Sequence, residues 1–263
     1  MKKDEIRNAN RKALPKFLLV LAVCAVAGGA AGYGFVKYGL DQMAGAIKDA
    51  GALFGMHIAP WLMVVIAAVL PAVCVPLYRR AKKLLGAWDG EDEEISDEID
   101  RKLSTAIWIS SALLVFSYFL IAASYSGGFA TFDSKGNTIV FCVAIAAFLA
   151  VMIEMVIIQQ KCVDAAKQTN PEKKASIYDM RFQKKWMEDC DEAEKIMTGK
   201  CAYKAYTATN TVCTILAIVL ALCALVFEIG FLPSFVVCLV WLVNLSVYCK
   251  EAIRYSKAGN KIS

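Results

Sequence analysis

Six long runs of apolar residues constrain this chain more than any other feature of its sequence. Each run has about twenty residues, and a helix of that length crosses the ~30 Å hydrocarbon core of a bilayer. Six helices that are apolar on every side are not expected in a soluble protein of 263 residues. The pattern therefore predicts an all-α polytopic membrane helix bundle with six transmembrane helices in three hairpins. The predicted spans are about 17–36, 59–78, 105–124, 138–160, 208–227 and 231–249.

The basic residues fall mainly on one side of this bundle. Of the 29 Lys and Arg residues, only Lys37, Lys48 and Lys135 lie in the segments that connect the spans on the other side. The positive-inside rule places the basic side in the cytoplasm, so both termini are expected to be cytoplasmic. We expect one integral membrane domain over residues 1–263. Its predicted cytoplasmic segments are 1–16, 79–104, 161–207 and 250–263.

Two of these cytoplasmic segments are expected to contain amphipathic helices. In the first, an acidic start is followed by Ile95, Ile99 and Leu103 at a spacing of four, and the helix runs on into the third span. In the second, Asn170-Pro171 ends the helix that leaves the fourth span. An apolar stripe then recurs at spacings of three and four, which predicts one helix over 178–201. The stripe contains Tyr178, Phe182, Trp186, Cys190, Ala193, Met197 and Cys201.

This stripe has to be covered, and two interpretations remain open. It packs against the rest of the chain or the membrane surface, or it docks a cytoplasmic or membrane protein partner. In the second case Tyr178, Phe182, Trp186 and Met197 form the partner-docking face.

A polar site is predicted in the inner half of the bundle. Ionisable groups are costly inside a membrane, so Glu154 in the fourth span marks a candidate site. Asn244 in the sixth span lies at a similar depth, so the two side chains are expected to pair. Pro71 and Pro76 in the second span leave backbone carbonyls without their usual helical partners. The functional interpretation is a substrate or proton site. The structural one is a hydrogen-bonded Glu154 that fixes helix packing.

Other classes of site have little support in the sequence. Histidine occurs once and no Cys-x-x-Cys pair is present, so neither a metal nor a cofactor is expected. We find no nucleotide-binding loop, metalloprotease helix or nucleophile elbow, and therefore predict no catalytic residues and no enzyme activity. The basic residues lie at helix ends rather than on one folded face, which argues against nucleic-acid binding.

Three segments carry a resemblance to a known family. They are the acidic helix Asp92–Leu103, the stretch from Phe182-Gln183-Lys184-Lys185-Trp186 to Asp191-Glu192-Ala193-Glu194-Lys195, and the ending from Phe231-Leu232-Pro233 to Tyr248. Together they resemble an uncharacterised family of six-span membrane proteins of Gram-positive bacteria, defined as a domain of unknown function. The resemblance implies a bacterial plasma membrane location and assigns no catalytic residues.

These features predict an integral membrane protein that is not an enzyme. The leading hypothesis is a permease-like or transport-accessory component that uses the Glu154 region. The alternative is a regulatory or signalling membrane protein that docks a cytoplasmic partner through the 178–201 helix. The lipid bilayer is the one partner that every interpretation shares.

Overall fold

The structure is a computed structural model of the chain, and only part of the chain is described in it. The described residues are 14–16, 18–19, 22–23, 25–26, 29–30, 33, 45, 49–125, 134–227 and 230–256. The first predicted span, 17–36, lies largely outside them.

The described residues are all-α, as predicted, and contain no strand. Five helices in this part of the chain are long and apolar enough to cross a membrane, and each contains most of one predicted span. These helices are Asp49–Ala87, Glu93–Ser124, Lys135–Thr169, Glu192–Ala224 and Leu232–Arg254.

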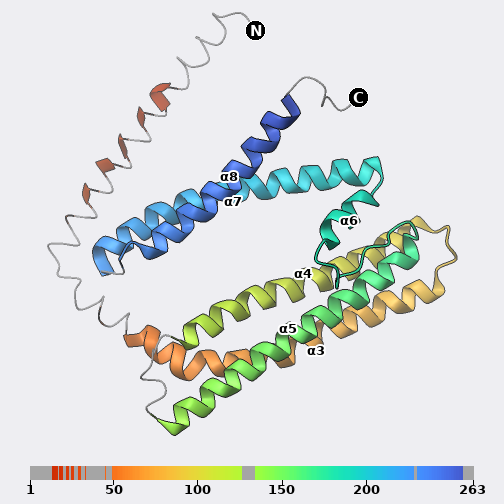
Figure 1. The fold of residues 1–263 in the computed structure, drawn as a ribbon, viewed down its shortest axis with the longest axis horizontal. Coiled ribbons are helices and arrows are strands. Elements are labelled where there is room, and N and C mark those ends of the chain that lie inside the picture. The colour runs from red at the N-terminus through yellow and green to blue at the C-terminus, as the bar shows by residue number, and fades with distance from the viewer. Residues whose placement is uncertain are drawn as a thin grey trace, which may run out of the picture. The chain divides into compact units, whose positions relative to one another are not determined.

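The chain divides into two compact units, of which Lys48–Ala205 is the larger. In this unit the helices α3 (Ala59–Ala87), α4 (Glu93–Ser124) and α5 (Lys135–Thr169) each contact the other two (Figure 1). A short π-helical turn, Phe54–Ile58, leads directly into α3. The core between the three helices is apolar and fully buried at its centre. Its largest members include Met63, Leu70, Ile99, Leu103, Leu120 and Val151.

Local sequence signals set where these helices begin and end. Asp92 is the N-cap of α4, and its side chain accepts hydrogen bonds from the backbone N–H groups of Glu94 and Ile95. The α5 helix ends at Thr169, and the Asn170 side chain donates to the carbonyl of Ala166, 3.1 Å away. The predicted helix end at Asn170-Pro171 is therefore confirmed. Both ends are closed by side chains whose hydrogen bonds replace those that the helix backbone lacks.

The segment after α5 differs from the prediction of one helix over 178–201. It contains a turn-rich stretch, then the seven-residue helix α6 (Phe182–Glu188), a break at 189–191, and the start of α7 (Glu192–Phe227). The break has a local cause in Asp191, which accepts a hydrogen bond from the Glu194 N–H, while the Glu194 side chain accepts one from the Asp191 N–H. This reciprocal pair is a capping box, so a new helix starts here although the apolar spacing continues across it.

The other unit contains Met1–Ile47 and Tyr206–Ser263. Within it, the greater part of α7 and the helix α8 (Leu232–Ser256) run antiparallel and side by side (Figure 1). Tyr206 and Tyr248 stack with ring centroids 4.2 Å apart. One turn further along each helix, the Asn244 amide donates to the Asn210 carbonyl oxygen at 3.2 Å. Aromatic stacking and an amide hydrogen bond thus fix the register of this helical pair.

Candidate functional site

Glu154 lies in a pocket between α3 and α5. The pocket has a volume of about 250 Å³, and the prolyl ring of Pro71 forms part of its wall. The structure thus brings together two of the four residues predicted for an intramembrane site. The remaining lining residues are Val75, Tyr78, Arg79, Ile157, Ile158 and Lys161.

The Glu154 carboxylate is only partly compensated in this pocket. Its Oε2 atom is buried and has no hydrogen-bond partner among the described residues. Arg79 and Lys161 line the same pocket, but neither forms an ion pair with Glu154. A buried acceptor without a partner costs about 1–3 kcal/mol, so this oxygen is available to a proton or to a ligand that donates to it.

The other two predicted residues lie elsewhere. Pro76 is in the same helix as Pro71 but is exposed and does not line the pocket. Asn244 belongs to the other compact unit, where its amide is hydrogen bonded to Asn210. The pairing of Asn244 with Glu154 therefore stays a prediction. Asn210 itself was missed, although a second amide in an apolar span is a sequence signal for such a partner.

The basic residues of the Glu154 pocket were also missed from the sequence. Lys161 follows Glu154 by seven residues, so both lie on one face of α5, and Arg79 follows Pro71 by eight on α3. That spacing places Lys161 about two turns from Glu154 on α5 and Arg79 about two turns from Pro71 on α3. The spacing of the charged residues, rather than that of the apolar residues, was the sequence signal for these two basic groups.

The predicted docking residues do not form one continuous face in the structure. Phe182 and Trp186 pack on each other with ring centroids 5.5 Å apart. Together with Met197 they line a second pocket, which also contacts α4 and α5. Tyr178 does not line that pocket and is 70% exposed. Tyr178 is set apart because it lies in the turn-rich stretch that precedes α6, whereas Phe182 and Trp186 belong to that helix.

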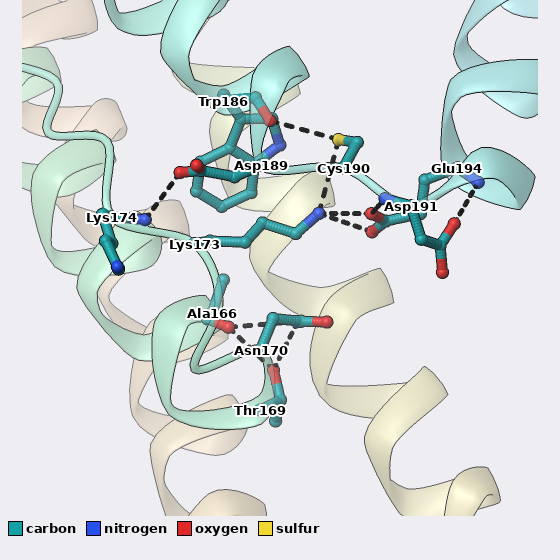
Figure 2. Close-up of polar contacts among 10 residues, drawn as sticks. All are labelled: Ala166, Thr169, Asn170, Lys173, Lys174, Trp186, Asp189, Cys190, Asp191 and Glu194. Atoms are coloured by element: carbon teal, nitrogen blue, oxygen red, sulfur yellow. Dashed lines mark hydrogen bonds and ion pairs between the residues drawn. The ribbon is translucent and has the colours of Figure 1, made fainter.

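A buried lysine organises the segment between α5 and α7 (Figure 2). Lys173 is only 4% exposed, and its Nζ lies 2.6 Å from both carboxylate oxygens of Glu194. The same ammonium group lies 3.4 Å from the Cys190 sulfur and 5.1 Å from the centroid of the Trp186 ring. The Lys174 backbone N–H donates to Asp189 at 2.8 Å. A charge buried this far from water needs such compensation to be tolerated.

The titration of this ion pair reflects both burial and pairing. For Lys173, burial acts to lower the pKa, but the hydrogen bonds and charges of Glu194 and Cys190 outweigh it and hold the pKa above its usual value. For Glu194, burial acts to raise the pKa, while hydrogen bonds from Lys173 and the Asp191 backbone bring it below the usual value. Both groups are therefore charged near neutral pH.

Large apolar side chains are exposed on all three long helices of the larger unit. So many exposed apolar side chains are not expected on a protein surrounded by water, whereas hydrocarbon covers them at no cost. They include Trp61, Val65, Trp108, Val115, Phe119, Ile139, Leu149 and Ile153. With five helices of membrane-spanning length, these observations define a multi-pass α-helical membrane protein.

Comparison with known proteins places the chain more narrowly. The model of the family described as "Protein of unknown function (DUF3169)" matches residues 12–252, so the chain belongs to this family. This confirms the resemblance to a family defined as a domain of unknown function. No curated protein and no solved structure matches the chain.

Proposed function

We propose that this protein is a permease-like membrane component in which the Glu154 pocket holds a proton or a small solute. The uncompensated Glu154 carboxylate is the observation that carries the proposal. A carboxylate that only fixed helix packing is expected to be hydrogen bonded on both oxygens, because an unmade bond destabilises the fold. The pocket beside it provides space for a partner that the protein itself does not supply.

The composition of the pocket supports a polar or ionic occupant. Glu154 contributes a carboxyl group, while Arg79 and Lys161 contribute two positive charges on the same two helices. Acidic and basic groups gathered beside a helix proline are the kinds of group from which transporters build solute and ion sites.

The experiment compares solute retention by membrane vesicles that contain the wild type, Glu154→Gln, or the matched control Glu172→Gln. Glu172 is exposed and lies outside both pockets, so its substitution makes the same chemical change without touching the site. Untargeted mass spectrometry should find solutes whose retention differs between wild-type and empty vesicles. Glu154→Gln should reduce this difference at least about tenfold, the effect of losing one charged hydrogen bond. Equal retention by the wild type and Glu154→Gln would contradict the proposal.

A chemical measurement tests the site independently of the solute. Dicyclohexylcarbodiimide reacts with protonated carboxyl groups in apolar surroundings. We expect it to label Glu154 in the wild type and in Glu172→Gln, and to leave Glu154→Gln unlabelled at the corresponding peptide. Absence of labelling at Glu154 in the wild type would show that the carboxyl group is inaccessible.

The proposal includes six spans in three hairpins, with both termini in the cytoplasm of a bacterial plasma membrane. The distribution of the basic residues supports this orientation. Alkaline phosphatase, which is active outside the cytoplasm, should be active when fused after Asp133 and inactive when fused after Met180. The reverse result would overturn the orientation.

A docking role is the second candidate, and the turn-rich stretch before α6 favours it. Tyr178 is 70% exposed and Met180 is fully exposed, which leaves two large apolar side chains without cover. A pull-down from mild detergent tests this role by comparing the wild type with Trp186→Asp and Tyr178→Asp. A docking protein should lose its partner in both variants and keep it in Glu154→Gln. A permease should instead lose solute retention in Glu154→Gln while any partner binding stays intact.

A further inference from the structure

A second pocket is lined by residues of α4, α5, α6 and the first two turns of α7. Its volume is about 560 Å³, within the roughly 300–1,000 Å³ typical of small-molecule sites. The pocket reaches from Asp100 to Ser111 along α4 and from Gln159 to Asn170 along α5. Each of these stretches covers about 16 Å of helix, so the pocket has room for a bulky ligand with a charged group and an apolar body.

Most of the pocket wall is apolar, and two aromatic rings close one side. Leu103, Ile107 and Val163 line it from the long helices. Phe182 and Trp186 contribute the aromatic pair, and one of these rings already binds a cation, because the Lys173 ammonium lies 5.1 Å from the Trp186 centroid. Aromatic faces attract ammonium groups through the ring quadrupole, so this wall favours positive charge.

The charges around the pocket do not balance. Its charged lining residues are Asp100, Lys173 and Glu194. Lys173 is paired with Glu194 through both carboxylate oxygens, and no residue in the described part of the chain forms an ion pair with Asp100. The pocket therefore has one carboxylate without a paired cation.

The surroundings of Asp100 disfavour its charged form in the absence of a ligand. Asp100 precedes the predicted 105–124 span, and burial raises its pKa, with further contributions from the negative charges of Asp97 and Glu194. The nearby Lys173 charge and a hydrogen bond with Thr169 oppose this effect but do not cancel it. A cation placed beside Asp100 would remove the imbalance, whereas an anion would increase it.

We propose that the pocket binds an amphipathic organic cation, an amine or quaternary ammonium group attached to an apolar body. The cationic group lies beside Asp100, and the apolar body extends between Ile107 and Val163 against the Phe182–Trp186 wall. This site shares no lining residue with the Glu154 pocket, so it stands whether or not the transport proposal holds.

The experiment uses two probes of nearly the same shape and opposite charge. The full-length protein in detergent is titrated by calorimetry with tetraphenylphosphonium, a cation, and with tetraphenylborate, an anion. Binding to protein-free micelles is subtracted. We expect saturable binding of the phosphonium ion at about one site per chain and at least about tenfold weaker binding of the borate ion. Failure of the phosphonium to bind, or equal binding of both ions, would overturn the proposal.

Two variants locate the site. Asp100→Asn keeps the shape of the side chain and removes its charge, so it should weaken phosphonium binding at least about tenfold. Asp97→Asn removes a neighbouring charge outside the pocket and should change binding less than about threefold, an effect of screened charge alone. Equal losses in both variants, or no loss in Asp100→Asn, would count against the site. An unchanged Tm in Asp100→Asn shows that its fold is intact.

The same cationic group can belong to a free solute or to a lipid headgroup. Repeating the titration in nanodiscs of phosphatidylglycerol, with and without phosphatidylethanolamine, distinguishes these sources. Competition by phosphatidylethanolamine would identify the ligand as a lipid amine. Unchanged phosphonium binding would identify a free organic cation, and either result supports a cation site at Asp100.

Discussion

Two ionisable side chains in the larger unit, Lys173 and Glu154, have opposite surroundings. Lys173 has a carboxylate, a thiol and an aromatic ring around its ammonium group, so its charge is fully compensated within the protein. Glu154 has one carboxylate oxygen that is buried without any partner among the described residues. A charged group whose partners lie within the protein helps to hold the fold together. A polar group without such a partner is able to bind a proton or a ligand. Lys173 therefore holds local structure together, and the functional role of Glu154 stays part of the proposed function.

The largest effect is expected where the compensated pair is broken. Glu194→Gln leaves the Lys173 ammonium buried without its counter-charge, which should cost about 3 kcal/mol. The cost should appear as opening of the segment that Lys173 holds together. Tryptic cleavage after Lys184 and Lys185, both exposed in α6, should therefore become faster than in the wild type.

A double variant is the control for this prediction. Lys173→Met/Glu194→Leu removes both charges and leaves apolar side chains, so it should recover much of the lost stability. If Glu194→Gln is cleaved at the wild-type rate, the ion pair does not hold the segment together, and Lys173 does not have the architectural role described above.

The second prediction concerns pH. Because the pKa of Glu194 is lowered in the fold, its stabilising contribution is present above its ordinary pKa of 4.5 and is lost as the pH falls through the lowered value. Because the pKa of Lys173 is raised, its contribution is complete below 10.5 and is lost as the pH rises through the raised value. The Tm of the wild type should therefore fall more steeply below pH 4.5 than that of the Lys173→Met/Glu194→Leu variant.

Asp100 provides a further test in the same pH experiment, because its pKa is shifted in the opposite direction to that of Glu194. Its pKa is raised, so the contribution from its protonated form is complete below its ordinary pKa of 3.8 and is lost as the pH rises through the raised value. Protonation of Asp100 in acid partly offsets the loss at Glu194. Asp100→Asn lacks this offset, so its Tm should fall more steeply on acidification. A shallower fall of the Tm in Asp100→Asn than in the wild type would show that the pKa of Asp100 is not raised in the fold.

A smaller effect is expected at the capping box that starts α7. Asp191→Ala removes the oxygen that accepts from the Glu194 N–H at 2.7 Å, which should cost about 1 kcal/mol. Chemical unfolding or a Tm series can measure this loss of stability. The control is Glu172→Ala, a substitution at an exposed residue in the turn that follows α5. A stability equal to that of Glu172→Ala would mean that the cap does not fix the helix start.

The smallest effect on stability is expected at Glu154. Since its Oε2 has no partner to lose, Glu154→Gln should change the free energy of unfolding by less than about 1 kcal/mol. The same variant should reduce solute retention at least about tenfold, so activity and stability separate at this residue. A loss of stability as large as that of Glu194→Gln would instead make Glu154 a packing residue and remove the contrast with Lys173.

The sequence by itself determined the helical class of this protein, its long apolar helices and several helix ends. These follow from local chemistry, since apolar length predicts spanning helices, and Asp92 and Asn170 carry the side chains that close a helix end. Glu154 was found in the same way, because one charged residue in an apolar run is visible without knowing its neighbours.

The tertiary structure alone decided which groups meet. Lys173 and Glu194 are separated by 21 residues, and no periodic pattern reports a contact between a turn and a helix start. The apolar spacing from Tyr178 to Cys201 predicted one helix because periodicity records which residues share a face, not whether the backbone continues between them. The Asp191–Glu194 capping box interrupts that helix, while burial of Lys173 directs Trp186 and Glu194 inward. The long-range contact of Lys173 with Glu194 therefore shaped the second pocket, and local sequence set only the elements that line it.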